Sequence, residues 1–489
     1  MISALTRTES WSSTLHSLHK WAIPDFYDKM PYDHTNSWII AAPIPFILLQ
    51  IHLLIRYDPK TTLLLRTSLI PIVVLLSLRS TFAYYYKLTG QGQLDGRGQH
   101  VNITLGCAAI CIIIWSLGWG LTLQPPRLKV APSTTNGAKN GLHNRQLSKG
   151  KAKAESDLPT FFPGTKMPVE LDLLLNLRGI GWEYGIKQGA PALPVPQVTT
   201  QQRLSWIVRH LAEVPLYYLL YDAILVLIED QRFNLHAHTR YGGSIWDCRK
   251  GSFGAAGPYL ICAAYASSFI CVKAMMHAVL GAISIGFLND LPSRWDPQAV
   301  QVPWLSTSVH QLWSKRWHQY LRVTFMTLGF WPVRDTLKPI AGRRVANIAG
   351  IWGTFLASSF VHEFGRVNLA PKPGFCVTHV SLFFAIQPIA IFAEQGWEKV
   401  TGRKVRGVLG WLWTMTWMLS TSPLLMEVSA AITTQTILFK DTHTDSFPLI
   451  SFQMMNRDGM LASKNMTLAV TKRPVTLMLD WWDNVVRGL

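Results

Sequence analysis

The sequence has few charged residues. Asp, Glu, Lys and Arg make up 15% of its 489 residues, whereas an ordinary globular domain contains about 25%. Hydrophobic residues make up 49% and aromatic residues 11%, and the mean hydropathy is +0.17. This shortage of charge argues against a chain of several soluble domains and indicates a polytopic membrane protein.

Cysteine is also scarce, and its placement excludes several kinds of site. No cysteine pair has the spacing of zinc ligands with histidines nearby, so we expect no metal site. Most cysteines fall within apolar segments, which is typical of small buried hydrophobic residues and not of a disulfide framework. There is no Gly-x-Ser-x-Gly elbow and no cysteine with a histidine beside it, which argues against a covalent mechanism. The six are Cys107, Cys111, Cys248, Cys262, Cys271 and Cys376.

A cleavable signal peptide is not expected, because the first thirty residues contain Pro24, Asp25 and Asp28 and no apolar core. The first span would then act as an uncleaved anchor. The formal net charge is +18, but the basic residues are spread over loops and form no single stripe, which argues against a nucleic-acid partner. Basic cytosolic loops explain most of this charge, and an anionic cosubstrate could explain part of it.

Apolar stretches of roughly bilayer-spanning length recur along the chain. The expected spans cover about 37–55, 63–85, 101–123, 206–228, 259–288, 345–363, 376–392 and 408–426. We therefore predict an all-α polytopic membrane protein with about eight transmembrane helices around a buried histidine site. The expected organisation is an interfacial N-terminal segment (1–36), the first transmembrane helices (37–123), a basic cytosolic loop (124–203), a membrane core (204–440) and a C-terminal tail (441–489).

The central loop divides into two parts. It carries eleven Lys and Arg against five Asp and Glu, which places it in the cytosol under the positive-inside rule. Residues 133–156 are rich in Lys, Gly, Asn and Ser and are expected to be a disordered insertion. The stretch from Leu171 to Trp182 is apolar enough to fold back onto the membrane domain, and a surface loop with glycine turns is the alternative.

The stretch 259–288 is too long for one untilted span, so we expect a tilted helix or a span followed by a re-entrant piece. It carries Lys273 and His277, which lie four residues apart and share one face of a helix.

Two polar clusters stand in apolar surroundings between Trp313 and Glu363. The first reads Trp-Ser-Lys-Arg-Trp-His318-Gln, and the second reads Ser358-Ser359-Phe-Val-His362-Glu. On a helix, the two serines would share a face with His362. An ionisable residue in a membrane-length apolar segment is a candidate for function. The alternative is a histidine satisfied by a backbone carbonyl or a serine hydroxyl.

These two motifs, in this order, resemble the wax-synthase-like branch of the membrane-bound O-acyltransferases. A third motif, Asn176-Leu-Arg-Gly-Ile-Gly-Trp182, is similar to the fungal members that acylate terpenoid and meroterpenoid alcohols. The resemblance covers roughly Asn176 to Glu427, and it implies that residues 204–440 form an acyltransferase core. Many relatives have Ser-Gly where this chain has Ser358-Ser359, and many have Asn in place of His318.

The resemblance implies that His362 is the general base and that Ser358 or Ser359 fixes its tautomer, with Glu363 as a further supporting residue. His318 would orient the substrate or donate to the thioester carbonyl, whereas Trp317 is more often a packing residue. Acyl-coenzyme A, with acetyl as the favoured acyl group, would be the cosubstrate, and no permanently bound cofactor is expected. A lipophilic alcohol would be the acceptor, in an integral membrane protein of the endoplasmic reticulum.

Basic residues near the motifs have two interpretations. They could pair with the phosphates of coenzyme A at a cytosolic opening, or they could be positive-inside anchors that contact lipid headgroups. These residues are Lys315, Arg316, Arg322, Arg334 and Lys338.

Two other functions remain open. A long-chain wax-ester or sterol-ester synthase of the same family would differ only in the volume of its acyl tunnel. A transporter with His362 in a proton relay should show two similar halves, and the sequence shows no such internal repeat. No histidine is followed by Asp four residues later, the arrangement of soluble coenzyme A acyltransferases.

Overall fold

A computed structural model of the chain describes residues 13–25, 28–85, 96–129, 158–185, 198–228, 244–298, 301–317, 319–367 and 379–437. Four features that the sequence singled out lie outside these residues: His318, Cys376, the insertion 133–156 and the tail 441–489. The expectations for them stay predictions.

The described residues are mainly helical. In the N-terminal half the helices are α2 (Ile44–Arg56), α3 (Leu63–Ser68), α4 (Ile70–Phe82), α5 (Gly96–Leu121), α6 (Val169–Leu175), α7 (Thr200–Ile228) and α8 (Gly257–Phe287). In the C-terminal half they are α9 (Pro292–Trp295), α10 (Val309–Gln311), α11 (Arg322–Phe325), α12 (Trp331–Val367), α13 (His379–Thr401) and α14 (Gly407–Ile437).

Short 3-10 and π segments connect these helices. The 3-10 segments are η2 (Ser37–Ile40), η4 (Ile245–Lys250), η5 (Gly254–Ala256), η6 (Pro303–Leu305) and η8 (Gln319–Leu321), and the π segments are η7 (Leu312–Arg316) and η9 (Met326–Phe330). Two strands of two residues each, β1 (Met30–Pro31) and β2 (Tyr84–Tyr85), pair in parallel.

Five helical segments of the described residues are long and apolar enough to cross a membrane. They are Ser37–Arg56, Leu63–Phe82, Val101–Leu121, Thr200–Ile228 and Gly254–Phe287. The all-α membrane fold is therefore confirmed, and these segments coincide with the first five expected spans. The expected total of about eight is not confirmed, because α12, α13 and α14 are helical but more polar and are not among the five.

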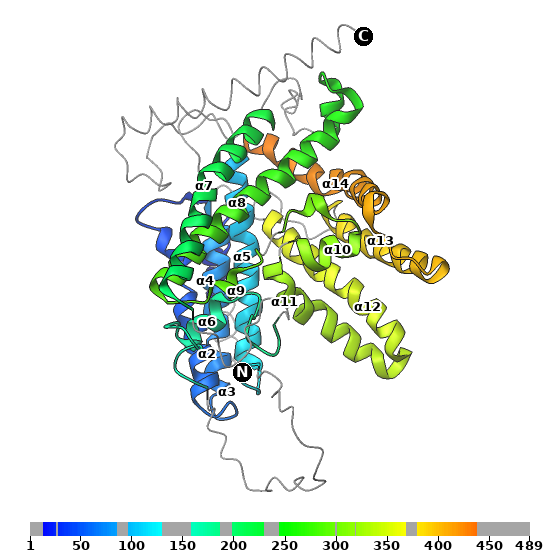
Figure 1. The fold of residues 1–489 in the computed structure, drawn as a ribbon. Helices are drawn as coiled ribbons and strands as arrows, with labels where there is room; N and C mark the ends of the chain where they lie inside the picture. The colour runs from blue at the N-terminus through cyan, green and yellow to red at the C-terminus, as the bar shows by residue number, and fades with distance from the viewer. Residues whose placement is uncertain are drawn as a thin grey trace, which may run out of the picture.

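Figure 1 shows two groups of helices: one group, the bundle, contains α2, α4, α5, α7 and α8, and the other contains α12, α13 and α14. In the first group α5 packs against α2 and α4, and α7 packs against α8. Helix α5 joins the groups, because it packs against α2, α3 and α4 and also against α12. Helix α12 in turn packs against α13, and α13 packs against α14. The helix that carries His362 therefore lies between the bundle and the two C-terminal helices.

Small residues let α5 and α12 approach closely. A Cβ added to Gly106 would lie 2.8 Å from the Cα atom of Gly365, which real contacts do not allow. Next to this crossing, the thiol of Cys107 donates a hydrogen bond to the carbonyl oxygen of Val361 at 3.5 Å. Close helix contacts of this kind are common in membranes, and this one anchors the turn that contains His362.

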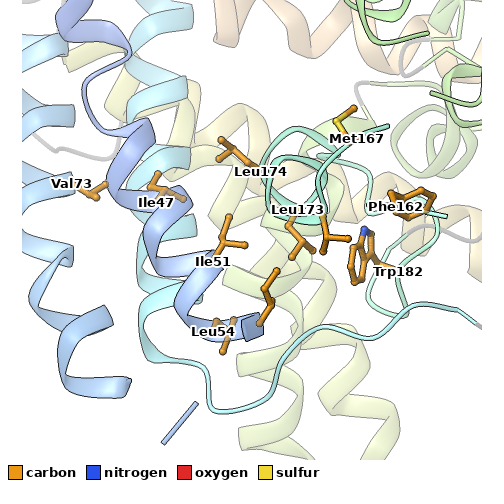
Figure 2. Close-up of a cluster of buried hydrophobic side chains, with 11 residues drawn as sticks. Ile47, Ile51, Leu54, Val73, Phe162, Met167, Leu173, Leu174 and Trp182 are labelled. Carbon is orange, nitrogen blue, oxygen red and sulfur yellow. The ribbon is translucent and has the colours of Figure 1, made fainter. Parts of the chain in front are cut away.

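The loop around α6 folds back onto the bundle, as the apolar stretch from Leu171 to Trp182 predicted. Trp182 is fully buried and belongs to one apolar cluster with Ile51 of α2 (Figure 2). The turn before it requires glycine, because Gly181 has a φ of +92° and a Cβ there would lie 2.5 Å from the ring of Phe162.

Candidate active site

His362 lies in the C-terminal half of α12. Its Nδ1 atom is 2.8 Å from the backbone carbonyl oxygen of Ser358, and its ring centroid is 4.6 Å from that of Phe384 on α13. Because a carbonyl oxygen only accepts hydrogen bonds, we assign the proton of the neutral ring to Nδ1 and the lone pair to Nε2. The residue expected to fix the tautomer, Ser358, does so through its main chain.

The other two supporting residues point toward α13. The hydroxyl of Ser359 donates to the hydroxyl of Ser381 at 3.0 Å, and Ser381 donates to Glu363 at 3.0 Å. The second oxygen of Glu363 accepts from Arg366 at 2.8 Å. This chain of contacts ties α12 to α13 beside His362 and stabilises the position of the helix.

The first motif begins in the π segment η7, which ends at Arg316, and Trp317 follows it. Trp317 stacks on Phe269 of α8, with ring centroids 6.0 Å apart and planes 23° apart, so its packing role is as expected. Trp313 meets the ring of Phe384 at 6.3 Å. Since Phe384 also contacts His362, one aromatic ring joins the two motifs that are far apart in the sequence.

Gln387 is a site residue that the motifs did not indicate. Its side chain is fully buried on α13, and its oxygen accepts hydrogen bonds from Trp313 at 3.3 Å and Trp417 at 3.0 Å. The sequence indicated this residue only as a glutamine inside an expected apolar span, where a polar side chain is unfavourable unless it has a partner.

Two of the basic residues predicted to bind coenzyme A donate hydrogen bonds to the main chain. Arg316 donates to the carbonyl oxygens of Gln301 and Val302, each at 3.2 Å. Arg322 donates to the carbonyl oxygen of Ser314 at 2.7 Å. These guanidinium groups stabilise the loop that carries the first motif. Lys315 is exposed.

The remaining two predicted basic residues, Arg334 and Lys338, line a cleft of about 560 Å³. Arg343 and Asn347 also line it, and the sequence analysis did not include these two residues in the site. Its apolar lining comes from Met326, Phe330, Trp331 and Ile351. We call this feature the basic cleft.

A break in α12 shapes the basic cleft. Gly342 has φ +75° and ψ 166°, so two helical pieces meet there at a kink. Arg334 precedes the kink and Arg343 follows it, and both line the same cavity. The guanidinium of Arg334 lies 4.3 Å from the centroid of Trp331 and donates to Asp335 at 2.8 Å. Three cations therefore line the cleft, and Asp335 pairs with one of them, so the cleft keeps a net positive charge.

The Asn176–Trp182 motif has a structural role. Asn176 closes the turn by accepting from the amide of Ile180 at 3.1 Å and donating to its carbonyl at 2.8 Å. Arg178 donates to the carbonyl oxygen of Pro297 at 2.7 Å. Burial and the nearby charge of Arg294 lower the pKa of Arg178 to about 10, so the group stays charged at neutral pH.

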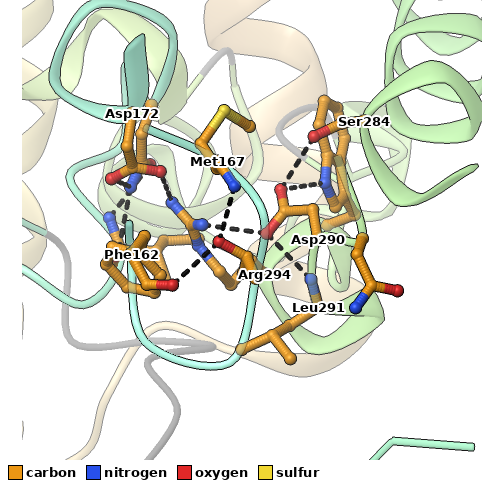
Figure 3. A network of polar contacts seen from close by, with 12 residues as sticks. Phe162, Met167, Asp172, Ser284, Asp290, Leu291 and Arg294 are labelled. Carbon is orange, nitrogen blue, oxygen red and sulfur yellow. Dashed lines mark hydrogen bonds and ion pairs between the residues drawn. The ribbon is translucent and has the colours of Figure 1, made fainter. Parts of the chain in front are cut away.

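A buried ion network holds this motif to the end of α8 (Figure 3). Arg294 pairs with both Asp172 and Asp290. The second oxygen of Asp172 accepts from the indole nitrogen of Trp182 at 2.7 Å, and Asp290 accepts from Ser284 at 3.0 Å. All the charges are paired, which a buried network requires.

In the described part of the chain, no group of His, Cys, Asp and Glu side chains is arranged to hold a metal ion. The five cysteines described there are free thiols.

Comparisons with known proteins agree with the motifs. Residues 295–386 match the family model described as "Membrane bound O-acyl transferase family". The chain is similar to acetyltransferase pyr8 of Aspergillus fumigatus, with 28% identity over 276 residues, 51% of this chain and 61% of the relative. A probable long-chain-alcohol O-fatty-acyltransferase 7 of Arabidopsis thaliana is 27% identical over 118 residues, 23% of this chain and 34% of the relative.

Acetyltransferase TRI7 of Fusarium sporotrichioides is 27% identical over 164 residues, 30% of this chain and 36% of the relative. The chain thus matches less than two thirds of the length of each of these relatives. No solved structure is significantly similar. The segment 295–386, which matches the membrane bound O-acyl transferase family model, contains both His motifs.

Proposed function

We propose that this protein is an acyl-coenzyme A-dependent O-acyltransferase that transfers an acetyl group to a hydroxyl of a lipophilic small molecule such as a terpenoid. The observation that carries the proposal is the hydrogen bond from His362 Nδ1 to the carbonyl of Ser358, because it leaves the lone pair on Nε2. Two fungal relatives are named acetyltransferases, which supports the acetyl donor.

His362 acts as the base in this mechanism. Its Nε2 atom accepts the proton of the acceptor hydroxyl while the hydroxyl oxygen attacks the thioester carbonyl. The carbon–sulfur bond then breaks, and the thiol leaves with the proton that His362 returns. One ester and one thiol form, and no net proton is gained or lost. His318 would bind the carbonyl or the hydroxyl, as the family resemblance implies.

The basic cleft is the proposed site for the phosphates of coenzyme A. Arg334, Lys338 and Arg343 supply three cations, and arginine suits phosphate through paired N–H donors. Ile351 is the lining residue of the cleft that is nearest to His362 in sequence. At a rise of 1.5 Å per residue, α12 extends about 16 Å from Ile351 to His362. The extended arm of the cosubstrate would run along this helix, so the cleft binds one end of the donor and His362 meets the other.

A long-chain fatty-acyl donor is the second candidate, because the plant relative is named a long-chain-alcohol O-fatty-acyltransferase. The test is to incubate microsomes containing the protein with labelled acetyl- or palmitoyl-coenzyme A and a panel of terpenoid alcohols. Acetyl ester formation that is lost in His362→Ala supports the proposal. Exclusive use of palmitoyl-coenzyme A would establish the second candidate, and no transfer from either donor would overturn both. We also propose that the protein resides in the membrane of the endoplasmic reticulum, and immunolocalisation with a marker of that organelle tests this.

A further inference from the structure

Helix α8 contacts the first motif on both sides of His318. Phe269 stacks on Trp317, which precedes that histidine. Lys273, one helical turn further, places its ammonium 5.6 Å from the ring centroid of Tyr320, two residues after the histidine. One face of α8 therefore holds both flanks of the segment 317–320.

Lys273 is an unusual residue for this position. It is the one Asp, Glu, Lys or Arg of α8, and an ammonium within a membrane-length apolar helix is unfavourable unless it has a partner or a function. Among the described residues it lies near two aromatic faces, since its ammonium is also 4.8 Å from the centroid of Phe269. A cation between two rings gains cation–π attraction, which is strongest where water is absent.

The same cluster reaches the helix of the base. Lys273 and Tyr320 are both within electrostatic range of the Cys107 sulfur. The thiol of Cys107 donates to the carbonyl of Val361, the residue immediately before His362. Lys273 and the first motif thus lie near Cys107 of α5, which contacts the helix of the base.

We propose that Lys273 is a positioning residue: held between Phe269 and Tyr320, its ammonium fixes the segment that carries His318 relative to His362. The catalytic part of this inference rests on the proposed acyltransferase function. Because Lys273 acts through aromatic contacts, an arginine should replace it and a neutral side chain of similar length should not.

The test compares Lys273→Met with Lys273→Arg. The Met variant should lower kcat about 10- to 100-fold, because small displacements of positioned groups have effects of this size, while KM for donor and alcohol changes less than about threefold. The Arg variant should recover most of the activity. The melting temperature of Lys273→Met should not fall, since an apolar side chain is favourable in an apolar helix. A parallel loss of stability and activity would mean a structural role and overturn the proposal.

Tyr320 provides the partner variants. Tyr320→Phe keeps the ring and should behave as wild type, whereas Tyr320→Leu should resemble Lys273→Met. The double variant Lys273→Met with Tyr320→Leu should be no less active than either single variant, since both remove one interaction. Fully multiplicative losses would overturn the coupling. Met276→Leu is the matched control, because Met276 is on the exposed face of α8 and should change nothing.

Hydrogen exchange tests the same inference without an activity assay. The amides of residues 317–322 should exchange faster in Lys273→Met than in wild type or Met276→Leu. If wild type transfers no acyl group but this exchange is faster, the proposed function fails and the positioning contact stands. If wild type is active and neither kcat nor exchange changes in Lys273→Met, the positioning role is wrong.

Discussion

The side-chain oxygen of Gln387 accepts a hydrogen bond from the indole nitrogen of Trp313, 3.3 Å away on a different element. The same oxygen accepts from Trp417 on α14, and the amide nitrogen donates to the carbonyl of Phe383 at 3.1 Å. One buried amide thus holds the first motif against α13 and α14.

Gln387→Leu should therefore destabilise the protein. The substitution leaves two indole N–H groups without their acceptor, at about 1–3 kcal/mol for each buried unpaired donor. Thermal unfolding in detergent measures the loss. Ile389→Leu, at a half-exposed position on the same helix, is the control and should change little. An unchanged melting temperature in Gln387→Leu would contradict the assigned role.

His362→Ala should abolish acyl transfer without unfolding the protein. Removal of a general base lowers the rate about 10²- to 10⁴-fold, measured as turnover per folded protein. The control is His310→Ala, because the His310 side chain is exposed on α10. Activity of His362→Ala within a few-fold of wild type would exclude it as the base.

His318→Asn should keep partial activity, and His318→Leu should not. Imidazole and amide side chains can both hydrogen-bond a carbonyl or hydroxyl, whereas leucine cannot. Steady-state rates with one donor and one alcohol measure the difference. Equal activity of the two variants would assign His318 a packing role.

Neutralising the basic cleft should weaken donor binding selectively. Lys338→Gln with Arg343→Gln should raise KM for acyl-coenzyme A and leave KM for the alcohol nearly unchanged. The difference from wild type should shrink at high salt, because exposed charges are screened over about 8 Å at physiological ionic strength. Arg403→Gln with Arg406→Gln removes two exposed charges outside the cleft and is the control. If both double variants raised KM for acyl-coenzyme A equally, the effect would come from general membrane electrostatics and not from the basic cleft.

Asp172→Ala should be strongly destabilising. It leaves Trp182 without its acceptor and Arg294 with one of its two carboxylates, and breaking a buried ion pair costs about 3–5 kcal/mol. Glu398→Ala breaks an exposed pair with Lys404 at 3.8 Å and should cost about 1 kcal/mol or less. Chemical denaturation measures the free energy of unfolding of both variants. Similar losses of stability would contradict the conclusion that burial makes the Asp172 ion pair the more important one.

Local properties explain what the sequence predicted well. The first five spans follow from apolar length. His362 stands out in the sequence as an ionisable residue in an apolar run, and its role as the base stays a prediction. The segment before Trp182 was apolar enough to indicate that it folds back, and its burial confirms this.

The sequence could not indicate geometry that residues distant in the chain determine. Arg316 and Arg322 resemble phosphate ligands in sequence, and their hydrogen bonds to main-chain carbonyls became visible only in the structure. Arg343 joins the basic cleft only because the chain bends at Gly342. Single glycines inside a helical pattern do not indicate such a bend reliably.

The pairing of Asp172 with Arg294 also has a consequence for biogenesis. The two residues are 122 positions apart in the chain, and both α7 and α8 are synthesised between them. During translation the Asp172 carboxylate must stay hydrated until those two helices have entered the bilayer and Arg294 has left the ribosome. Docking of the α6 segment can therefore complete only after insertion of the first five spans, so protease resistance of this segment would report that step in a translating chain.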